Sequence, residues 1–218
     1  MTPLHHPSGT LRFLALGDSY TIGEGVAPEA RWPNALARRL RTDGLDVAAP
    51  TVVAVTGWTT DELAAGIDRA EAEGVVAGPY DLVTLLIGVN DQYRGRALDA
   101  YRTGFRALLR RAIAFLRESG ELGGSDAGRV VVVSIPDWGV TPFAEGRDRA
   151  QIAREIDAFN AAAREETEAA GARFVDVTAL SRTQGAQVVG DRLHPNGAAY
   201  AAWTDRIEPE AKAALGGA

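Results

Sequence analysis

The stretch LRFLALGDSYTIGEG contains a serine whose position suits nucleophilic chemistry. The run from Leu11 to Leu16 predicts a buried strand, and Gly17-Asp18 then allow a tight turn before Ser19. A serine at the exit of a strand can carry a hydroxyl that attacks a carbonyl carbon. The same serine can instead act as a helix N-cap, a position that serine favours. The triplet alone supports both interpretations equally.

The segment DRLHP, near the other end of the chain, carries the two groups that such a serine needs. An imidazole activates the hydroxyl by removing its proton, and a carboxylate orients the imidazole. Asp191 and His194 are three residues apart, so one short turn holds them together. Pro195 restricts His194 to an extended backbone and is expected in the first turn of the final helix. We therefore predict His194 as the base rather than an incidental histidine, with Asp191 as its partner and Asp176 as a less favoured substitute for Asp191.

Gly57 and Asn90 offer N–H groups suited to stabilising an oxyanion. Glycine lets the backbone approach a ligand closely, and the asparagine side chain is an amide donor. Taken singly, Gly57 is typical of a turn and Asn90-Asp91 of a strand end. If the first three strands are neighbours about 4.8 Å apart, Ser19, Gly57 and Asn90 lie within reach of one ligand.

Composition excludes several other chemistries. The chain has 218 residues, a net charge of −6 and no cysteine, which rules out thiol nucleophiles, disulfides and thiolate metal sites. Its single lysine is Lys212, so a phosphate-binding GK[ST] loop is absent and a lysine Schiff base is disfavoured. His5 and His6 lie near the N-terminus, which leaves His194 for internal imidazole chemistry. No basic block favours a nucleic-acid partner, and we expect neither a cofactor nor a metal.

Strand-like and helix-like segments alternate along the chain, a pattern typical of a parallel sheet covered by helices on both faces. Apolar runs predict strands at Leu11–Leu16, Val47–Val55, Leu82–Ile87, Val130–Ile135 and Arg173–Val177. Amphipathic periodicity predicts helices over Pro33–Thr42, Thr60–Glu73, Asp99–Ser119, Arg147–Ala170 and Gly197–Leu215. One face of the third helix would carry Tyr101, Phe105, Leu108, Leu109, Ala112 and Leu116.

The chain length fits one domain, which we place over residues 11–218. Residues 1–10 are expected to form a flexible N-terminus, and Glu121–Gly128 a flexible loop. We recognise neither a membrane-spanning run nor a secretory signal, and therefore expect a cytoplasmic protein. In parallel α/β sheets ligands bind beyond the carboxyl ends of the strands, which is where the candidate residues occur.

Four separated motifs together resemble the SGNH hydrolases, also called GDSL-type esterases and lipases. GDSY resembles the serine block, TGWTT the glycine block, GVND the asparagine block and DRLHP the aspartate–histidine block, in the family's order. The resemblance implies a three-layer α/β/α, flavodoxin-like fold with a five-stranded parallel sheet ordered 2-1-3-4-5. It implies Ser19 as nucleophile, His194 as general base and then acid, and Asp191 as the residue that orients His194. The implied oxyanion hole consists of the backbone N–H groups of Ser19 and Gly57 and the amide of Asn90.

Departures from the family's pattern leave the lining of the site open. Tyr20 stands where the commonest signature has leucine, and the block at Thr56-Gly57-Trp58 often begins with an asparagine further upstream. Four aromatic residues near strand exits either line the pocket or pack beneath loops, namely Trp58, Tyr93, Trp138 and Phe143. We expect Arg94 and Arg96 on a solvated loop rather than against an anionic substrate group, Asp137 in a turn, and Asp18 as a support for the turn at Ser19.

These features predict a serine esterase that hydrolyses small-molecule acyl esters through an acyl-serine intermediate. Esterases with a GxSxG motif differ, because here Thr21 occupies the fifth position and the serine follows the first strand. An acyltransferase of the same architecture, which would use an alcohol in place of water, is not separated from a hydrolase by sequence. A non-catalytic or nucleotide-binding domain is less favoured, since no GxGxxG follows the first strand.

Overall fold

The sheet at the centre of the fold is parallel between all its paired strands. The computed structural model describes residues 9–116 and 126–216. The strands lie in the order β2-β1-β3-β4-β5, which confirms the predicted sheet and its order. They are β1 (Phe13–Gly17), β2 (Thr51–Ala54), β3 (Leu82–Leu86), β4 (Val130–Val133) and β5 (Arg173–Val175).

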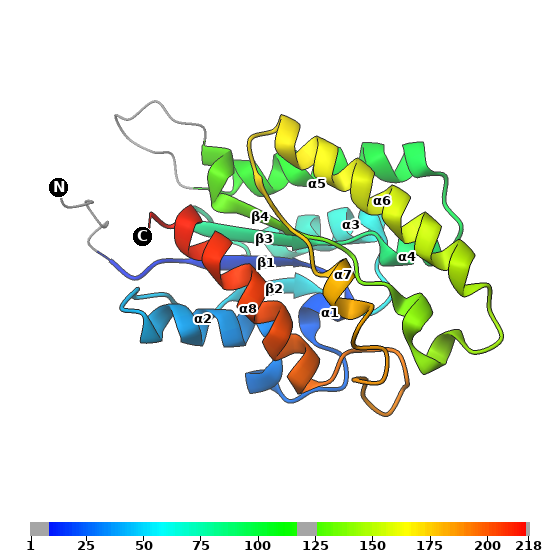
Figure 1. Cartoon of the computed structure of the whole chain (residues 1–218). Helices are drawn as coiled ribbons and strands as arrows, with labels where there is room; N and C mark the ends of the chain where they lie inside the picture. Colours follow the sequence, from blue (N-terminus) through cyan, green and yellow to red (C-terminus); the bar gives the residue numbers. More distant parts are fainter. Residues whose placement is uncertain (1–8, 117–125, 217–218) are drawn as a thin grey trace.

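Helices cover both faces of the sheet and make three layers (Figure 1). Two helices, α2 (Trp32–Thr42) and α8 (Gly197–Ala214), pack together on one face. The other face carries α3 (Thr60–Ala72), α5 (Leu98–Ala114) and α6 (Arg149–Ala169). This division follows from right-handed crossovers, because the chain moves one way from β1 to β2 and the other way through β3, β4 and β5. The α/β/α fold is therefore confirmed.

The core consists of apolar residues on both sides of the sheet. Strands β1, β3 and β4 are buried along their whole length, as continuous apolar runs in a doubly covered sheet require. The predicted apolar face of α5 and the residues just beyond it is buried, including Tyr101, Phe105 and Leu116. No helix within the described part of the chain is both long and apolar enough to cross a bilayer.

The ordered elements are shorter or shifted at several predicted boundaries. The second strand begins at Thr51 rather than Val47, after a single bridge between Leu11 and Val47; Pro50 between them has no N–H to donate to a ladder. The first strand begins at Phe13 rather than Leu11 and ends at Gly17 rather than Leu16. The third, fourth and fifth strands end one or two residues before predicted. The helices match to within two residues, except that α5 ends at Ala114.

Some predictions fall on residues outside the described ranges. These are most of the N-terminal segment 1–10, the final residues of the predicted helix up to Ser119, and the loop from Glu121 as far as residue 125. The remaining residues of that loop, up to Gly128, belong to a 3₁₀ helix, η2 (Asp126–Arg129).

Three short helices at the carboxyl edge of the sheet were not predicted. They are α1 (Ser19–Ile22), α4 (Val89–Tyr93) and α7 (Thr178–Ser181), and Figure 1 shows them at the same end of the sheet. They follow β1, β3 and β5 within a few residues. A helix of one turn has too few residues to show a 3.6-residue apolar period, so hydrophobic patterning does not reveal it.

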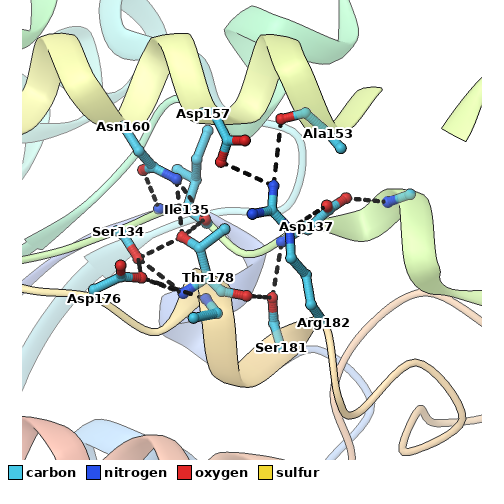
Figure 2. Close-up of polar contacts among 12 residues, drawn as sticks. Ser134, Ile135, Asp137, Ala153, Asp157, Asn160, Asp176, Thr178, Ser181 and Arg182 are labelled. Atoms are coloured by element: carbon cyan, nitrogen blue, oxygen red, sulfur yellow. Dashed lines mark hydrogen bonds and ion pairs between the residues drawn. The ribbon is translucent and has the colours of Figure 1, made fainter. Parts of the chain in front are cut away.

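A network of polar side chains surrounds the chain just beyond the end of β4 (Figure 2). The side chain of Asn160, on α6, accepts a hydrogen bond from Ile135 N (2.9 Å) and donates one to Ile135 O (3.0 Å). Ser134 Oγ accepts hydrogen bonds from the N–H groups of Val177 (2.9 Å) and Thr178 (3.2 Å). The backbone ladder makes one further contact, from Ser134 N to Val175 O at 2.9 Å. At Ile135 the side chain of Asn160 takes the place of a neighbouring strand, so the chain leaves the sheet with these backbone groups satisfied.

Replacing Asn160 by alanine tests how much this pairing stabilises the fold. The variant leaves the N–H of Ile135 buried without its partner, which we expect to lower the free energy of unfolding by about 1–3 kcal/mol. Urea denaturation measures the change. Gln151→Ala, on the same helix, removes only an exposed hydrogen bond to Glu155 and should change stability by less than about 0.5 kcal/mol. Equal effects of the two substitutions would contradict the assigned role.

Candidate active site

The turn after β1 places Ser19 at the first position of α1. Asp18, not Ser19, is the N-cap of this helix, and its Oδ1 accepts a hydrogen bond from Tyr20 N at 3.0 Å. A Cβ on Gly17 would lie 2.1 Å from Thr21 Oγ1 and 2.4 Å from Leu86 O. Only glycine permits this close approach of α1 to the end of β1. The capping role considered for Ser19 is therefore wrong, and its hydroxyl is free for another partner.

That partner is the imidazole of His194, which lies 175 residues further along the chain. Ser19 Oγ lies 2.8 Å from His194 Nε2, and His194 Nδ1 lies 2.6 Å from Asp191 Oδ2. Ser19 is 4% exposed and His194 6%, whereas the Asp191 side chain is 40% exposed. With Asp191 ionised, Nδ1 carries the proton and donates to the carboxylate, and Nε2 can accept from the serine hydroxyl.

The loop around Asp191 is fixed by its own backbone. Asp191 Oδ1 accepts hydrogen bonds from Leu193 N (2.8 Å) and His194 N (3.0 Å), and Arg192 adopts a left-handed φ of 69°. Partial burial opposes ionisation of Asp191, but the hydrogen bonds from His194 and the backbone outweigh it and hold the pKa of Asp191 below its usual value. Pro195 does not lie in the first turn of α8, as was expected: it precedes the N-cap Asn196, whose side chain accepts hydrogen bonds from Ala198 N and Ala199 N.

Gly57 and Asn90 face the same cleft as Ser19 and His194. Gly57 has a left-handed φ of 85°, and Trp58 N donates to Val55 O at 3.3 Å, which closes a turn around it. Such a turn does not use the N–H of its third residue, so the N–H of Gly57 stays available. Asn90 donates one amide hydrogen to Trp58 O at 2.9 Å and retains a second.

Arg94 and Arg96 contact the glycine turn and the first turn of α3. Arg94 donates to Gly57 O at 2.5 Å and pairs with Glu62 at 3.1 Å. Arg96 forms an ion pair with Asp61 and lies 3.6 Å from the buried carboxylate of Asp91. Both guanidinium groups form ion pairs with carboxylates of the protein, and both side chains are partly exposed, which is compatible with the expected place on a solvated loop.

An aromatic wall borders the cleft over Ser19. Tyr93, Trp138 and Phe143 line it, and their ring centroids lie 5.4–6.3 Å apart. Trp58 does not line it, because its ring packs on Gly66 of α3. Four further residues line the cleft that the sequence did not identify as lining: Tyr20, Thr56, Val89 and Leu193. Each is next to a motif residue along the chain, and Tyr20 had been noted only as a departure from the family's signature.

Hydrogen bonds hold both the indole N–H of Trp138 and the residue that precedes it. Its Nε1 donates to Gln92 Oε1 at 2.8 Å, and Gln92 Nε2 donates to Glu155 Oε2 at 2.7 Å. The preceding Asp137 accepts a hydrogen bond from Gly139 N at 2.9 Å. It also pairs with Arg182 Nε at 2.8 Å (Figure 2). Asp137 therefore has the turn role expected of it.

The substitute considered for Asp191 lies elsewhere. Asp176 Oδ1 accepts hydrogen bonds from Thr178 N (2.8 Å) and, more weakly, Ser134 Oγ (3.4 Å) beside β4 (Figure 2). The carboxylate at the imidazole is that of Asp191.

A second carboxyl group lies beneath the site. Asp18 is fully buried, and its Oδ2 has no hydrogen-bond partner among the described residues. Burial raises the pKa of Asp18 to about 8; the N–H of Tyr20 opposes this rise and the carboxylate of Asp91 adds to it. Burial thus favours the neutral form of this carboxyl group. In the described ranges, no group of three or more His, Asp or Glu side chains is arranged to hold a metal ion.

Comparisons with known proteins agree with this architecture. The sequence model of the GDSL-like lipase/acylhydrolase family matches residues 15–202, and none of the curated protein sequences matches the chain. The lipase Lip_vut3 from a goat rumen metagenome has a TM-score of 0.73 at 20% identity, over 92% of this chain and 97% of that chain.

Two esterases are similar in the same way. The psychrotrophic esterase EstA from Pseudoalteromonas sp. has a TM-score of 0.68 at 18% identity, over 94% of this chain and 98% of that chain. A variant of Axe2, an acetyl xylan esterase from Geobacillus stearothermophilus, has a TM-score of 0.67 at 19% identity, over 93% of this chain and 95% of that chain. At such identities the likeness shows a shared fold.

The buried acid beneath the site predicts a pH-dependent stability. Asp18 ionises near pH 4 in an unfolded chain but near pH 8 in the folded protein, so the folded state binds more protons between these values and stability falls as pH rises through this window. Asp18→Asn cannot ionise. Its gain in unfolding free energy over the wild type should be small near pH 4 and grow to on the order of 5 kcal/mol near pH 8.

Urea denaturation at a series of pH values measures this difference. Asp137→Asn is a matched control, because Asp137 is also buried but is paired with Arg182, and its loss should destabilise the protein at neutral pH. A pH dependence in Asp18→Asn identical to that of the wild type would show that Asp18 is ionised in the folded state.

Proposed function

From the premise that the chain belongs to the GDSL-like lipase/acylhydrolase family and is a hydrolase that acts on esters, we propose that it cleaves carboxylic esters through a covalent acyl-Ser19 intermediate. We also propose that residues 11–218 form a single domain. The observation that carries the proposal is the chain of hydrogen bonds from Ser19 Oγ through His194 to Asp191, at 2.8 Å and 2.6 Å, at the base of an apolar cleft.

In the first step Ser19 attacks the ester. His194 Nε2 takes the hydroxyl proton as Ser19 Oγ bonds to the carbonyl carbon, which leaves a tetrahedral intermediate with a negatively charged oxygen. The backbone N–H groups of Ser19 and Gly57 and the second amide hydrogen of Asn90 stabilise this charge. The intermediate collapses when His194 passes its proton to the leaving alcohol, and the acyl group stays on Ser19.

In the second step water releases the acid. His194 Nε2 takes a proton from water as the water oxygen attacks the acyl carbon, and the same donors stabilise the second oxyanion. The bond to Ser19 Oγ breaks and that oxygen regains a proton from His194. Asp191 stays ionised throughout and stabilises the imidazolium that forms in both steps, which its lowered pKa favours.

The cleft supports a small-molecule ester as the substrate. Its empty space amounts to about 520 Å³, part of it open to solvent, and its walls carry aromatic and aliphatic side chains. Such a site holds apolar groups by burial. Similar structures include an esterase, a lipase and an acetyl xylan esterase, which agrees with an ester as the substrate.

Ser19→Ala tests the nucleophile directly. We expect hydrolysis of p-nitrophenyl acetate to fall by on the order of 10⁶-fold, because the substitution removes the covalent route. A fluorophosphonate probe should label the wild type at Ser19, as found by peptide mass spectrometry, and fail to label the variant. Ser181→Ala, which removes another buried serine hydroxyl, should keep the label. Labelling of Ser19→Ala at the rate of the wild type would rule out Ser19 as the nucleophile.

Asn90→Ala tests the oxyanion hole. Loss of one donor to the tetrahedral intermediate should lower kcat by roughly 10²–10³-fold. Steady-state kinetics on p-nitrophenyl acetate measures this, with Asn34→Ala, which removes a surface hydrogen bond to Pro28, as a control with unchanged kcat. An unchanged kcat in Asn90→Ala would remove its amide from the mechanism.

A further inference from the structure

A guanidinium group lies against the aromatic wall of the cleft. The Cζ atom of Arg147 is 5.2 Å from the ring centroid of each of Tyr93, Trp138 and Phe143. These three rings line the cleft over the proposed nucleophile, but the proposed mechanism gives Arg147 no role. Its positive charge is permanent, because an arginine side chain keeps its proton at any pH used in an assay.

We propose that Arg147 binds an anionic group on the substrate, such as a carboxylate or a phosphate, so that the protein prefers esters that carry a negative charge over neutral esters of the same shape. The inference rests on the proposed function and names its substrate class. Arg147 determines specificity in this proposal and takes no part in the attack on the carbonyl carbon.

The guanidinium group is held in place although the side chain of Arg147 is exposed. All three ring centroids are within the distance of about 6 Å at which the face of an aromatic ring attracts a cation. Arg147 Nη2 also donates a hydrogen bond to the hydroxyl of Tyr93 at 3.1 Å. These contacts position a long side chain before a substrate arrives, which reduces the conformational entropy that is lost when an anion binds to it.

Arg147 occupies the solvent edge of the wall. Its side chain is exposed and Tyr93 is 45% exposed, whereas Trp138 is only 4% exposed. The guanidinium group therefore approaches the rings from the side of the solvent. One of its N–H groups binds Tyr93, and the guanidinium group has four others. A part of the substrate that extends along the wall toward solvent can meet these donors.

Helix α4 relates this cation to the proposed oxyanion hole. The helix carries both Asn90 and Tyr93, and residues three apart on a helix lie on the same side with about 5–6 Å between their Cβ atoms. Both residues line the cleft. A substrate whose carbonyl oxygen meets Asn90 thus has to extend by about the length of a tyrosine side chain to reach Arg147.

The charge of Arg147 differs in its surroundings from those of Arg149 and Arg192. Arg192 forms an ion pair with Glu145 at 2.9 Å, and Arg149 donates to the carbonyl oxygen of Gly139 at 2.7 Å. Among the described residues, no carboxylate forms an ion pair with Arg147. Since the whole chain has a net charge of −6, its overall field repels an anionic ester, and a preference for such an ester requires a local cation.

The test compares an anionic ester with a neutral ester of the same shape. 4-Acetoxybenzoate carries a carboxylate across the ring from its ester, and 4-acetoxybenzamide carries an uncharged amide there. We would measure kcat/KM for both and take the ratio of anionic to neutral ester within each variant, so that the intrinsic reactivities cancel between variants. The wild type should favour the anionic ester, and Arg147→Gln should lower the ratio by roughly 3- to 10-fold, as expected for one charged contact near solvent.

A second pair of esters places the same groups on the acyl part. These are the p-nitrophenyl esters of terephthalic acid, which keeps one free carboxylate, and of its monoamide. A preference for the anionic ester that falls in Arg147→Gln supports the proposal in either pair, and the pair that responds shows whether the alcohol or the acyl part carries the anion.

Two further variants separate the contact from a general effect of charge. Arg147→Lys keeps the charge but loses the planar set of N–H donors, so its ratio should lie between those of the wild type and Arg147→Gln. Arg154→Gln is the matched control, because it removes the same charge from an exposed position on α6, and its ratio should equal that of the wild type. Added salt should lower the wild-type ratio but not that of Arg147→Gln.

The proposal is overturned if the wild type favours the anionic ester in neither pair, if Arg147→Gln leaves both ratios unchanged, or if Arg154→Gln lowers them equally. The proposed function is judged separately, by fluorophosphonate labelling of wild-type Ser19 and hydrolysis of p-nitrophenyl acetate. Both would persist if only the contact with an anion were wrong.

Discussion

The close approach at Gly17 is the constraint on which the site depends. The end of β1 lies against Thr21 and against the backbone of β3 at Leu86, so that no side chain fits there. The chain must turn at once into α1, which buries Asp18 and brings Ser19 to the carboxyl edge of the sheet. Strand β1 is also flanked by both β2 and β3, whose exits supply Gly57 and Asn90. One glycine thus fixes the position to which the other groups must come.

Sequence patterning predicted the elements whose residues repeat with a clear period, and missed those that are too short to repeat. The buried run of β4 and the apolar face of α5 follow from hydrophobic spacing alone. The end of β4 does not follow from hydrophobic spacing, because the residue that hydrogen-bonds there, Asn160, lies on α6, 25 residues further along the chain than Ile135. The start of α8 shows the same limit locally: Pro195 looked like its first turn, but Asn196 holds the free N–H groups of the helix.

The candidate site divides in the same manner. Ser19, Asp191 and His194 could be proposed together because the chemistry of an activated hydroxyl names the residue types it needs, and the structure brings their side chains within hydrogen-bond distance. The residues that line the cleft could not be derived from the chemistry in this way. Trp58 and Trp138 both follow strands, yet one packs on Gly66 and the other faces the cleft. Which way an aromatic ring turns depends on distant partners such as Gln92, and no local pattern encodes them.

Two carboxyl groups flank the proposed machinery with opposite electrostatic character. Asp191 is partly exposed and receives hydrogen bonds from His194 and two backbone N–H groups, so its charged form is favoured where an imidazolium must form. Asp18, one residue before the proposed nucleophile, is buried, and one of its oxygens has no hydrogen-bond partner within the described part of the chain, so its neutral form is favoured. A charge at Asp18 would oppose the oxyanion that develops at Ser19 N–H, because attraction and repulsion both strengthen in a poorly hydrated interior. In the proposed mechanism, burial of Asp18 would disfavour negative charge beside the developing oxyanion, and the hydrogen bonds to Asp191 would favour it beside the imidazole.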